Sequence, residues 1–350
     1  MAAIDLGQFS HKILLKLPPE VAHSIGKFGM GYGIFAPGRY EVIDYMGGKP
    51  RLLGFELDNL LGLAAGFDKN GYLADHVQGY GFGYVEVGSV TWQGGKGNKK
   101  PRLFRLWEAE YRRGNLLNRM GLNGDPAYVV VDRLKRAKNP FAVNIAKTHN
   151  PEIIGDKAIQ DIKNTYQWVV NELKPRGKII YAAINISCPN TAEGKTFEDN
   201  PESLDELLSA IMECGREMPR LLKLSPTLIE EKARKIVEVA DNRVSGYICA
   251  NTLSMEHPNY GKGGVSGKIV RPNTLRTIEM MRSLTRKLII GCGGIETGRD
   301  MLETETAGAR VFQAFNGFVL GPYRGPRFAH RVLKEYYQLK NRQGLMGGQS

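Results

Sequence analysis

One pattern repeats from residue 60 almost to the end of the chain. A short apolar run ends in glycine, asparagine or serine, and a segment with helical spacing follows it. We expect strands at 60–67, 84–90, 141–146, 181–187, 221–225, 246–251, 287–294 and 309–315. We expect helices between most of them, at 125–138, 157–173, 201–215, 229–240, 272–284 and 297–306. Eight such alternations predict an α/β fold of the (β/α)8 TIM-barrel type, with a doubly wound parallel sheet as the alternative.

The first 45 residues lie outside this repeat. Segment 18–35 has apolar residues near helical spacing behind Pro18 and Pro19, but its glycines predict only a weak, short helix. We therefore divide the chain into an N-terminal helical extension at 1–45, a barrel at 46–340 and a flexible tail at 341–350. The apolar side of the extension is either a packing cap on the barrel or a surface that docks on a membrane.

Composition sets the broad class of protein. Apolar residues make up 42% and charged residues 24% of the chain, as in soluble globular proteins. Its four cysteines are far apart and have no histidine at ligand spacing, so we expect no disulfide framework and no metal. No apolar run reaches the roughly 18 residues of a membrane span. The net charge of +12 is compatible with RNA, an anionic membrane face, anionic small molecules or a simply basic surface.

Polar side chains gather at the ends of the expected strands, where a TIM barrel assembles its active site. They are Lys69, Asn144, Lys147, Asn185, Lys223, Asn251 and Thr252, with glycine-rich turns at 291–295 and 314–317. Neutral amides suit a flat heterocycle with many donors and acceptors. Lysines suit anionic oxygens, or the edge of a reduced flavin where negative charge develops. Glycines after the seventh and eighth strands commonly bind phosphate in such barrels.

The segment INISCPNT places Cys188 at the tip of the fourth strand. Pro189 ends the strand and keeps Cys188 extended. A lone free cysteine is more often structural than catalytic. Among amides and lysines, however, a thiol with a lowered pKa serves as a proton acceptor, so we predict that Cys188 is a base.

These motifs resemble those of the dihydroorotate dehydrogenases. The matching segments are LAAGFDKNG, GYGFGYVEVGSVTWQGGKGNKKPRLFRL, NRMGLN, NIAK, INISCPNT, KLSP, ANT, GGVSGK and IIGCGGI, in family order from about residue 60 to 322. PPEVAH resembles the start of the helical extension of class 2, the quinone-reducing, membrane-associated branch. The resemblance implies that (S)-dihydroorotate is oxidised to orotate in de novo UMP biosynthesis. Hydride would pass to N5 of FMN, Cys188 would be the base, and a quinone would take the electrons.

The resemblance also assigns site residues by their place in these motifs. Lys69 and Lys223 join Cys188 as catalytic residues, because Lys69 orients the substrate ring and Lys223 stabilises the reduced flavin. FMN would contact Ala65, Gly66, Lys69, Ser89, Asn144, Asn185, Lys223, Ala250, Gly267, Gly294, Phe315 and Asn316. Dihydroorotate would contact Lys69, Asn118, Arg119, Met120, Gly121, Leu122, Asn185, Asn190, Asn251 and Thr252. His23 and Arg105 would line the quinone route, and the protein would sit peripherally on the cytoplasmic side of a membrane.

The sequence departs from the family pattern at several places. Class 2 members usually carry serine where Cys188 stands, and cysteine marks class 1, which uses fumarate or NAD. Phe315–Asn316 replaces a Tyr–Ser or Tyr–Thr pair, Ala146 replaces a glycine, Leu122 replaces a common phenylalanine, and 111–115 contains an insertion. We favour quinone as acceptor, with fumarate or NAD in a soluble cytoplasmic enzyme as the alternative. A tRNA-dihydrouridine synthase is a further alternative, although only a short tail follows the last helix, so we expect no nucleic-acid partner.

Overall fold

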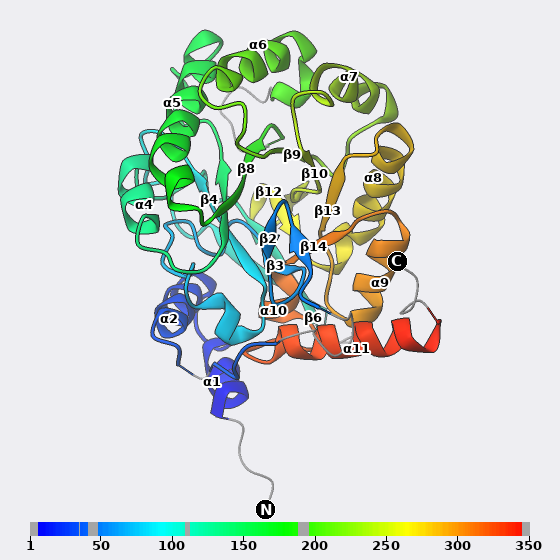
Figure 1. The fold of residues 1–350 in the computed structure, drawn as a ribbon. Helices are drawn as coiled ribbons and strands as arrows, with labels where there is room; N and C mark the ends of the chain where they lie inside the picture. Colours follow the sequence, from blue (N-terminus) through cyan, green and yellow to red (C-terminus); the bar gives the residue numbers. More distant parts are fainter. Residues whose placement is uncertain (1–5, 35, 41–47, 109–112, 188–195, 345–350) are drawn as a thin grey trace, which may run out of the picture.

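In the computed structural model, eight parallel strands close into a barrel, as Figure 1 shows, and the doubly wound alternative is excluded. The structure describes residues 6–34, 36–40, 48–108, 113–187 and 196–344. Around the barrel the strands follow chain order: β3 (Leu61–Leu63), β4 (Tyr84–Val90), β7 (Phe141–Ile145), β8 (Ile179–Asn185), β9 (Arg220–Leu224), β10 (Gly246–Cys249), β13 (Leu288–Cys292) and β14 (Val311–Ala314). β14 pairs with β3 through Phe312 and Leu61, which closes the ring.

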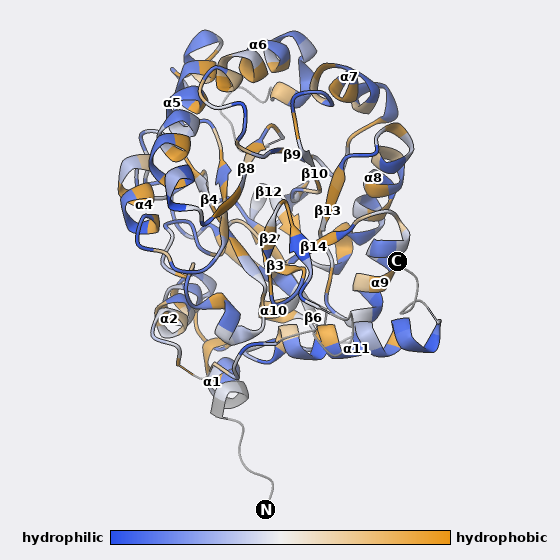
Figure 2. Cartoon of the chain, viewed as in Figure 1, coloured by the Kyte–Doolittle hydropathy of each residue, from blue (hydrophilic) through white to orange (hydrophobic). Residues whose placement is uncertain are grey.

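The expected helices surround the barrel. They are α4 (Ala127–Leu134), α5 (Asp156–Leu173), α6 (Pro201–Met212), α7 (Glu230–Ala240), α8 (Arg271–Leu284) and α9 (Gly298–Thr306), followed by α10 (Asn316–Leu320) and α11 (Phe328–Arg342). Local sequence fixes where several begin. Asn200 caps α6 by accepting from the backbone N–H of Ser203, and Thr297 with Asp300 forms a capping box at α9. Figure 2 shows mainly apolar strands inside helices of mixed polarity.

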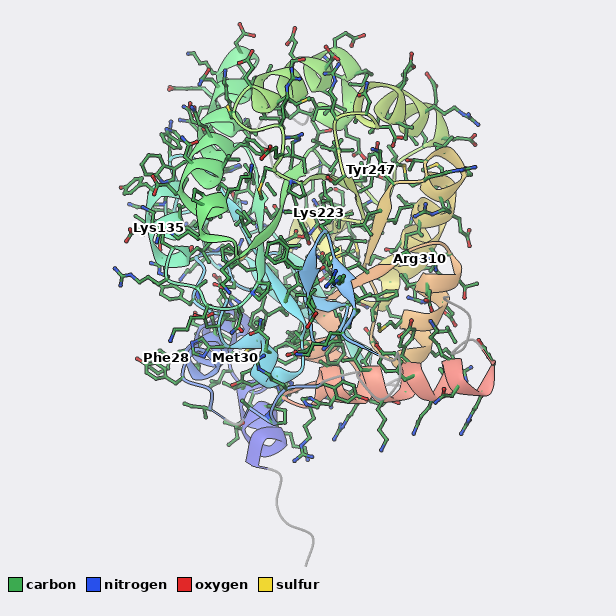
Figure 3. All side chains as sticks on the ribbon, viewed as in Figure 1. Phe28, Met30, Lys135, Lys223, Tyr247 and Arg310 are labelled. Carbon is green, nitrogen blue, oxygen red and sulfur yellow. The ribbon has the colours of Figure 1, made fainter. Side chains whose placement is uncertain are left out.

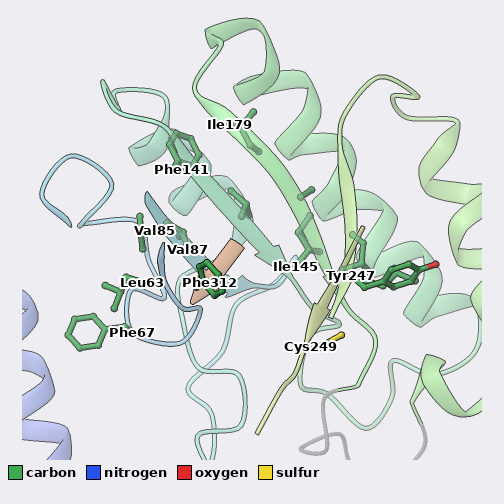
Figure 4. Close-up of a cluster of buried hydrophobic side chains, with 14 of the residues drawn as sticks. Leu63, Phe67, Val85, Val87, Phe141, Ile145, Ile179, Tyr247, Cys249 and Phe312 are labelled. Atoms are coloured by element: carbon green, nitrogen blue, oxygen red, sulfur yellow. The ribbon is translucent and has the colours of Figure 1, made fainter. Parts of the chain in front are cut away.

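Alternation along the strands divides the apolar residues into two layers. Outward-facing residues such as Val85, Phe141 and Phe312 pack against the helices and form the larger core, part of which Figure 4 shows. Inward-facing residues fill the barrel, and Leu52 and Leu57 beside the β1–β2 hairpin (Arg51–Leu52, Phe55–Glu56) pack against them. On β4, therefore, Glu86 points into the barrel while its neighbours Val85 and Val87 point out.

Two helices precede the barrel, α1 (Leu6–Leu14) and α2 (Pro19–Gly31). α2 is the helix expected within 18–35, and it is longer than its glycines suggested because Ala22 and Met30 are buried and Glu20 forms an ion pair with Arg102 at 2.9 Å. α1 was not expected. Within the described ranges, no helix combines the length and the apolar character that crossing a bilayer requires.

A second sheet lies beside the barrel and was not foreseen in the sequence. Its strands are antiparallel in the order β11 (Leu253–His257), β12 (Gly261–Ser266), β6 (Arg113–Asn118) and β5 (Leu103–Glu108). Its strands belong to two loops of the barrel repeat, 91–126 after β4 and 250–270 after β10. The expectation of one uninterrupted strand–helix repeat was wrong here, since all four strands are short and two of them, β6 and β12, contain glycine, which weakens the alternation signal.

Candidate functional site

A cavity of about 1250 Å³, open to solvent, lies at the carboxyl ends of the barrel strands. Every residue expected to contact the cofactor lines it: Ala65, Gly66, Lys69, Ser89, Asn144, Asn185, Lys223, Ala250, Gly267, Gly294, Phe315 and Asn316. Most of the residues expected to contact substrate line it as well: Lys69, Asn118, Met120, Leu122, Asn185, Asn251 and Thr252. The strand ends thus bring together residues separated by up to 250 positions in the chain, because parallel strands of a barrel end at one face.

Strand alternation decides which polar groups face this cavity. Asn144, Asn185 and Lys223 each occupy an inward-facing position on β7, β8 and β9, next to the purely apolar layer below them. Figure 3 shows Lys223 near the centre of the barrel. Lys147, which follows β7, is turned away and donates to the carbonyl oxygen of Ile153 at 2.8 Å. It does not belong to the site.

The loop that carries Lys69 is held by the carboxylate before it. Asp68 is fully buried, and its two oxygens accept from the backbone N–H groups of Gly71 at 3.0 Å and Leu73 at 2.7 Å. Asp68 also anchors β4, because the N–H of Gly88 donates to its carbonyl oxygen. These hydrogen bonds fix the position in the loop from which the Lys69 side chain projects. The sequence analysis did not identify this role of Asp68.

A chain of hydrogen bonds links the amides across the mouth. Ser89 Oγ donates to Asn144 Oδ1 at 2.5 Å, and Asn185 Nδ2 lies 3.4 Å from Ser89 Oγ. Asn251 Nδ2 in turn donates to Asn185 Oδ1 at 3.3 Å. These contacts orient each amide so that the cavity presents fixed donors and acceptors, which is what recognition of a planar polar ring requires.

The turns after β12, β13 and β14 bring backbone to the cavity wall. Gly294 has φ +69° and Gly267 has φ +122°, so both adopt a backbone that other residues rarely tolerate. A Cβ at Gly267 would also lie 2.3 Å from Asn115 Oδ1. Glycine is therefore required at this wall, and the turns supply backbone N–H groups where barrels commonly hold phosphate.

Two buried acceptors of the cavity wall have no hydrogen-bond partner within the described part of the chain. They are Oε1 of Gln313 on β14 and Oδ1 of Asn316 at the start of α10. Buried polar groups are nearly always paired, so these oxygens indicate a ligand that brings donors. The described residues contain no cluster of His, Cys, Asp or Glu suited to a metal ion.

Two expected substrate residues, Arg119 and Gly121, are not among the described residues that line the cavity. Arg119 donates to the carbonyl oxygen of Tyr260 at 2.9 Å, within the antiparallel sheet, and Gly121 serves a left-handed turn with φ +67°. The expectation for these two concerned their backbone in the NRMGL segment. Cys188 and Asn190 lie outside the described residues, so their expected roles stay predictions.

Two departures from the family pattern contact each other. Leu122 and Ala146 form a small apolar cluster of their own, and Leu122 lines the cavity. Ala146 adds a methyl group where a glycine was usual, while Leu122 is smaller than the common phenylalanine. The two changes offset each other in volume, and the contact between them could not be read from the sequence.

A second cavity, of about 1350 Å³ and mainly apolar, lies between α1, α2 and the barrel. It shares His23, Leu103, Leu116 and Phe315 with the first cavity, so these side chains form the wall between the two. His23, expected on the quinone route, donates from Nε2 to the carbonyl oxygen of Phe67 at 2.8 Å. Burial lowers the pKa of His23 to about 4, so the imidazole is neutral at pH 7.

Arg105, also expected on this route, lines the second cavity and holds the end of α1. Its guanidinium donates to the carbonyl oxygens of Leu15 at 2.8 Å and Leu17 at 2.7 Å. Its Nε is buried without a partner in the described ranges, although Arg105 borders the cavity. His11 of α1 lines the same cavity, and its Nε2 donates to the carbonyl oxygen of Val319 at 3.0 Å. Sequence reasoning missed His11, because α1 itself was not expected.

The closed barrel and its polar, phosphate-suited cavity define a TIM-barrel protein that binds a planar cofactor or substrate. Comparison with known proteins narrows the class: a family model described as "Dihydroorotate dehydrogenase" matches residues 49–339. The chain belongs to the dihydroorotate dehydrogenase family.

Relatives and solved structures agree with this assignment. The "Dihydroorotate dehydrogenase (quinone)" of Photorhabdus laumondii is 35% identical over 93% of this chain and 98% of its own length. That of Haloarcula marismortui is 36% identical over 80% of this chain and 77% of its own length. The crystal structure of the DHODH of Eimeria tenella in complex with ferulenol has a TM-score of 0.79 at 26% identity, covering 95% of this chain and 96% of that one.

Family membership implies a flavin cofactor, and the cavity fits one. The unpaired oxygens of Gln313 and Asn316 require donors, and the flavin ring and its side chain carry N–H and O–H groups. The glycine turns at Gly267 and Gly294 leave room for a phosphate against the backbone. The ammonium of Lys223 reaches the same cavity from β9 and suits the negative edge of a reduced flavin.

Proposed function

We propose that this protein oxidises dihydroorotate to orotate with FMN in the first cavity and a quinone in the second. The observation that supports it most directly is the pair of cavities separated by the wall of His23, Leu103, Leu116 and Phe315. One cavity carries several asparagine amides and the ammonium groups of Lys69 and Lys223, and it suits a flavin beside a ring acid. The other is mainly apolar and suits a quinone head group arriving from a lipid phase.

FMN, when bound, supplies the two-electron oxidation. The side chains do the rest: Lys69 binds the carboxylate or ring oxygens of the acid, and Asn118, Asn185 and Asn251 hold its amide edges. Lys223 keeps a positive charge at the cavity floor, where negative charge develops during the reaction. We propose that Sγ of Cys188 takes the proton from C5 of dihydroorotate and that Asn190 contributes to substrate binding.

The second cavity supports quinone as the electron acceptor. His23 is neutral, and its Nε2–H is occupied by Phe67, so only Nδ1 is left as an acceptor for a hydroxyl. Apart from Ser10, His11 and Arg105, the remaining wall is built mainly from aliphatic and aromatic side chains such as Leu14, Met30 and Phe318. Fumarate and NAD are charged and would lose hydration in this cavity. Among the described residues that line it, Arg105 is the one charged side chain, and its guanidinium already holds Leu15 and Leu17, so most of that hydration would not be replaced.

The outer surface of α1 and α2 supports peripheral docking on the cytoplasmic side of a membrane. Large apolar side chains there are well exposed: Ile13, Val21, Ile25, Phe28, Tyr32 and Ile34. Figure 3 shows Phe28 and Met30 on this part of the chain, where Phe28 is 64% exposed and Met30 is buried. Exposed lysines 12 and 16 accompany them, as in helices that lie on anionic lipid.

The test is anaerobic mixing of the purified, flavin-loaded protein with dihydroorotate, followed by reoxidation. We expect the flavin absorbance to bleach and then to return fastest with a water-soluble quinone, with little return on fumarate or NAD. A flavin that stays oxidised with dihydroorotate would refute the substrate. Faster return with fumarate or NAD would refute the quinone and favour the class 1-like alternative that Cys188 suggests.

A further inference from the structure

One carboxylate lies at the base of the flavin cavity and contacts side chains from four other strands. Glu86 of β4 is fully buried. Its Oε1 accepts from Asn144 Nδ2 at 2.8 Å and from Lys223 Nζ at 3.3 Å. Its Oε2 accepts from the hydroxyl of Tyr181 at 2.8 Å and from Gln313 Nε2 at 2.7 Å. Glu86 itself does not line the cavity, but Asn144, Lys223 and Gln313 all do.

The carboxylate decides how these cavity residues are oriented. An ionised carboxylate accepts hydrogen bonds and donates none, so the NH2 groups of Asn144 and Gln313 must point toward Glu86. The amide oxygens therefore point the other way. Asn144 Oδ1 accepts from Ser89 at 2.5 Å, and Gln313 Oε1 is the unpaired acceptor described above. Glu86 thus turns the Gln313 oxygen toward the ligand and the Asn144 oxygen toward Ser89.

The carboxylate also controls the charge of Lys223. Burial alone lowers the pKa of this lysine, but attraction to Glu86 and their hydrogen bond raise it above its ordinary value. The other ionisable groups around the pair are Cys292 on β13 and the phenols of Tyr84 and Tyr181, and burial raises the pKa of each. All three are therefore neutral near pH 7, and Glu86 is the anion that this network offers to the ammonium.

We propose that Glu86 is a positioning residue of the active site. It keeps Lys223 protonated and aimed at the flavin cavity, and it fixes the amide of Gln313 with its oxygen toward the ligand and the amide of Asn144 with its oxygen toward Ser89. The inference deepens the proposed function, since it assumes that a flavin occupies this cavity. Without Glu86, Lys223 would be a buried amine without a counterion, and the ammonium would lose its proton at a lower pH.

The first measurement needs no flavin. In cofactor-free protein, acetic anhydride acetylates neutral lysines, and mass spectrometry of the peptide that contains Lys223 gives the rate as a function of pH. For Glu86→Gln we expect acetylation of Lys223 at least about tenfold faster than in the wild type near pH 8, because a larger fraction of the amine is neutral. Identical pH profiles in the two proteins would overturn the proposal.

The second measurement is the reduction potential of the bound flavin against pH. In Glu86→Gln at low pH, the uncompensated ammonium should favour the reduced flavin about tenfold, which is about 30 mV for a two-electron couple. As pH rises and Lys223 loses its proton, this difference in potential should vanish. The plot of potential against pH should therefore change slope in Glu86→Gln at a pH where the wild-type plot does not. This change of slope should be missing from Glu86→Gln/Lys223→Met. A variant curve parallel to the wild type would contradict the proposal.

Tyr181→Phe is the matched control, because it removes one hydrogen bond to Glu86 and leaves the charge in place. Both readouts should stay as in the wild type. If Glu86→Gln does not fold, Glu86→Asp serves instead: its shorter side chain retreats from Lys223, and the acetylation profile should move part of the way. The two proposals can fail separately. If acetylation of Lys223 changes in Glu86→Gln as expected but dihydroorotate does not reduce the flavin of the wild type, the role of Glu86 is supported and the proposed substrate is refuted.

Discussion

The Nε2 atom of His23 lies 2.8 Å from the carbonyl oxygen of Phe67, and the two rings meet edge to face with centroids 5.0 Å apart. This contact joins α2 to the loop that carries Lys69. The N-terminal helices are therefore attached to the active site itself and not only to the outside of the barrel.

The buried histidines of α1 and α2 predict that the folded protein loses stability in acid. Burial lowers the pKa of His23 and of His11 from 6.5 to about 4. The unfolded chain therefore binds more protons than the folded one between about pH 6.5 and 4, and the free energy of unfolding falls as pH falls through that window. The loss is on the order of a few kcal/mol in total. Denaturant unfolding at several pH values measures it.

Glutamine keeps a donor but does not titrate, so His11→Gln/His23→Gln should remove most of this pH dependence. The slope that remains has two opposing sources, because burial lowers the pKa of His330 and raises the pKa of Glu198 to about 7. His257→Gln, on the antiparallel sheet, is the control for the substitution itself, because it lies outside the N-terminal helices. An undiminished slope in the double variant would contradict the assignment.

The contact between Leu122 and Ala146 predicts that a substitution at one position offsets the effect of a substitution at the other. Leu122→Phe alone adds volume against Ala146 and should raise the KM for dihydroorotate about tenfold, since overpacking costs about 1–3 kcal/mol. Leu122→Phe/Ala146→Gly should recover most of the loss. Steady-state kinetics of the four proteins form a double-mutant cycle, and strictly additive effects would show that the two positions are independent.

Exposed aromatics on α2 predict membrane binding. Phe28 and Tyr32 are 64% and 72% exposed, and their rings contact each other. Phe28→Ser/Tyr32→Ser should weaken binding to anionic vesicles by at least about tenfold, because inserting one such side chain is worth about 1.5–3 kcal/mol. The rate of flavin reduction by dihydroorotate should not change, because neither side chain lines the first cavity. Tyr128→Ser, on the flank of the barrel, is the matched control, and an equal loss there would argue against docking through α2.

The three contacts of Arg105 with the end of α1 predict that lysine cannot replace it. Arg105 donates to the carbonyl oxygens of Leu14, Leu15 and Leu17, which a single ammonium cannot reach together. Arg105→Lys should loosen α1 and raise the KM for quinone several-fold, with the rate of flavin reduction by dihydroorotate unchanged. Limited proteolysis and half-reaction kinetics test the two effects separately. Slowed flavin reduction would mean that Arg105 acts on the first cavity.

Cys188 predicts a pH profile. Cys188→Ser should slow flavin reduction and move its pH dependence to higher pH, because a thiol ionises near pH 8.5 and a serine hydroxyl far above it. Cys188→Ala should be slower by about 10²–10⁴-fold relative to the wild type. Cys214→Ser, at the end of α6, is the control. Reduction rates that match the wild type at every pH would remove Cys188 from the mechanism.

The barrel was predictable because each strand is short, apolar and followed by a polar or glycine signal. Lys223 was recognisable for the same reason, since a charge within LLKLSP has to face something other than the core. Its partner Glu86 was missed, because YVEVGSV also reads as an ordinary alternating strand. Only the closed barrel shows that the inward positions of β4 and β9 face each other.

Non-local contacts account for the other omissions. α1 is ordered by Arg105, almost a hundred residues away, and the antiparallel sheet joins two separate loops of the barrel. Neither relationship leaves a periodic signal in the local sequence. The role of Arg119 in substrate binding stays a prediction: its motif pointed to its backbone, and its side chain donates to the carbonyl oxygen of Tyr260.

The common wall formed by His23, Leu103, Leu116 and Phe315 has a pharmacological consequence. A compound lodged in the apolar compartment would leave the polar one open, so it would block turnover without competing with the acid. Two inhibitors of unlike chemistry could occupy one molecule together, and resistance to one, arising from changes in α1 or α2, would leave sensitivity to the other intact.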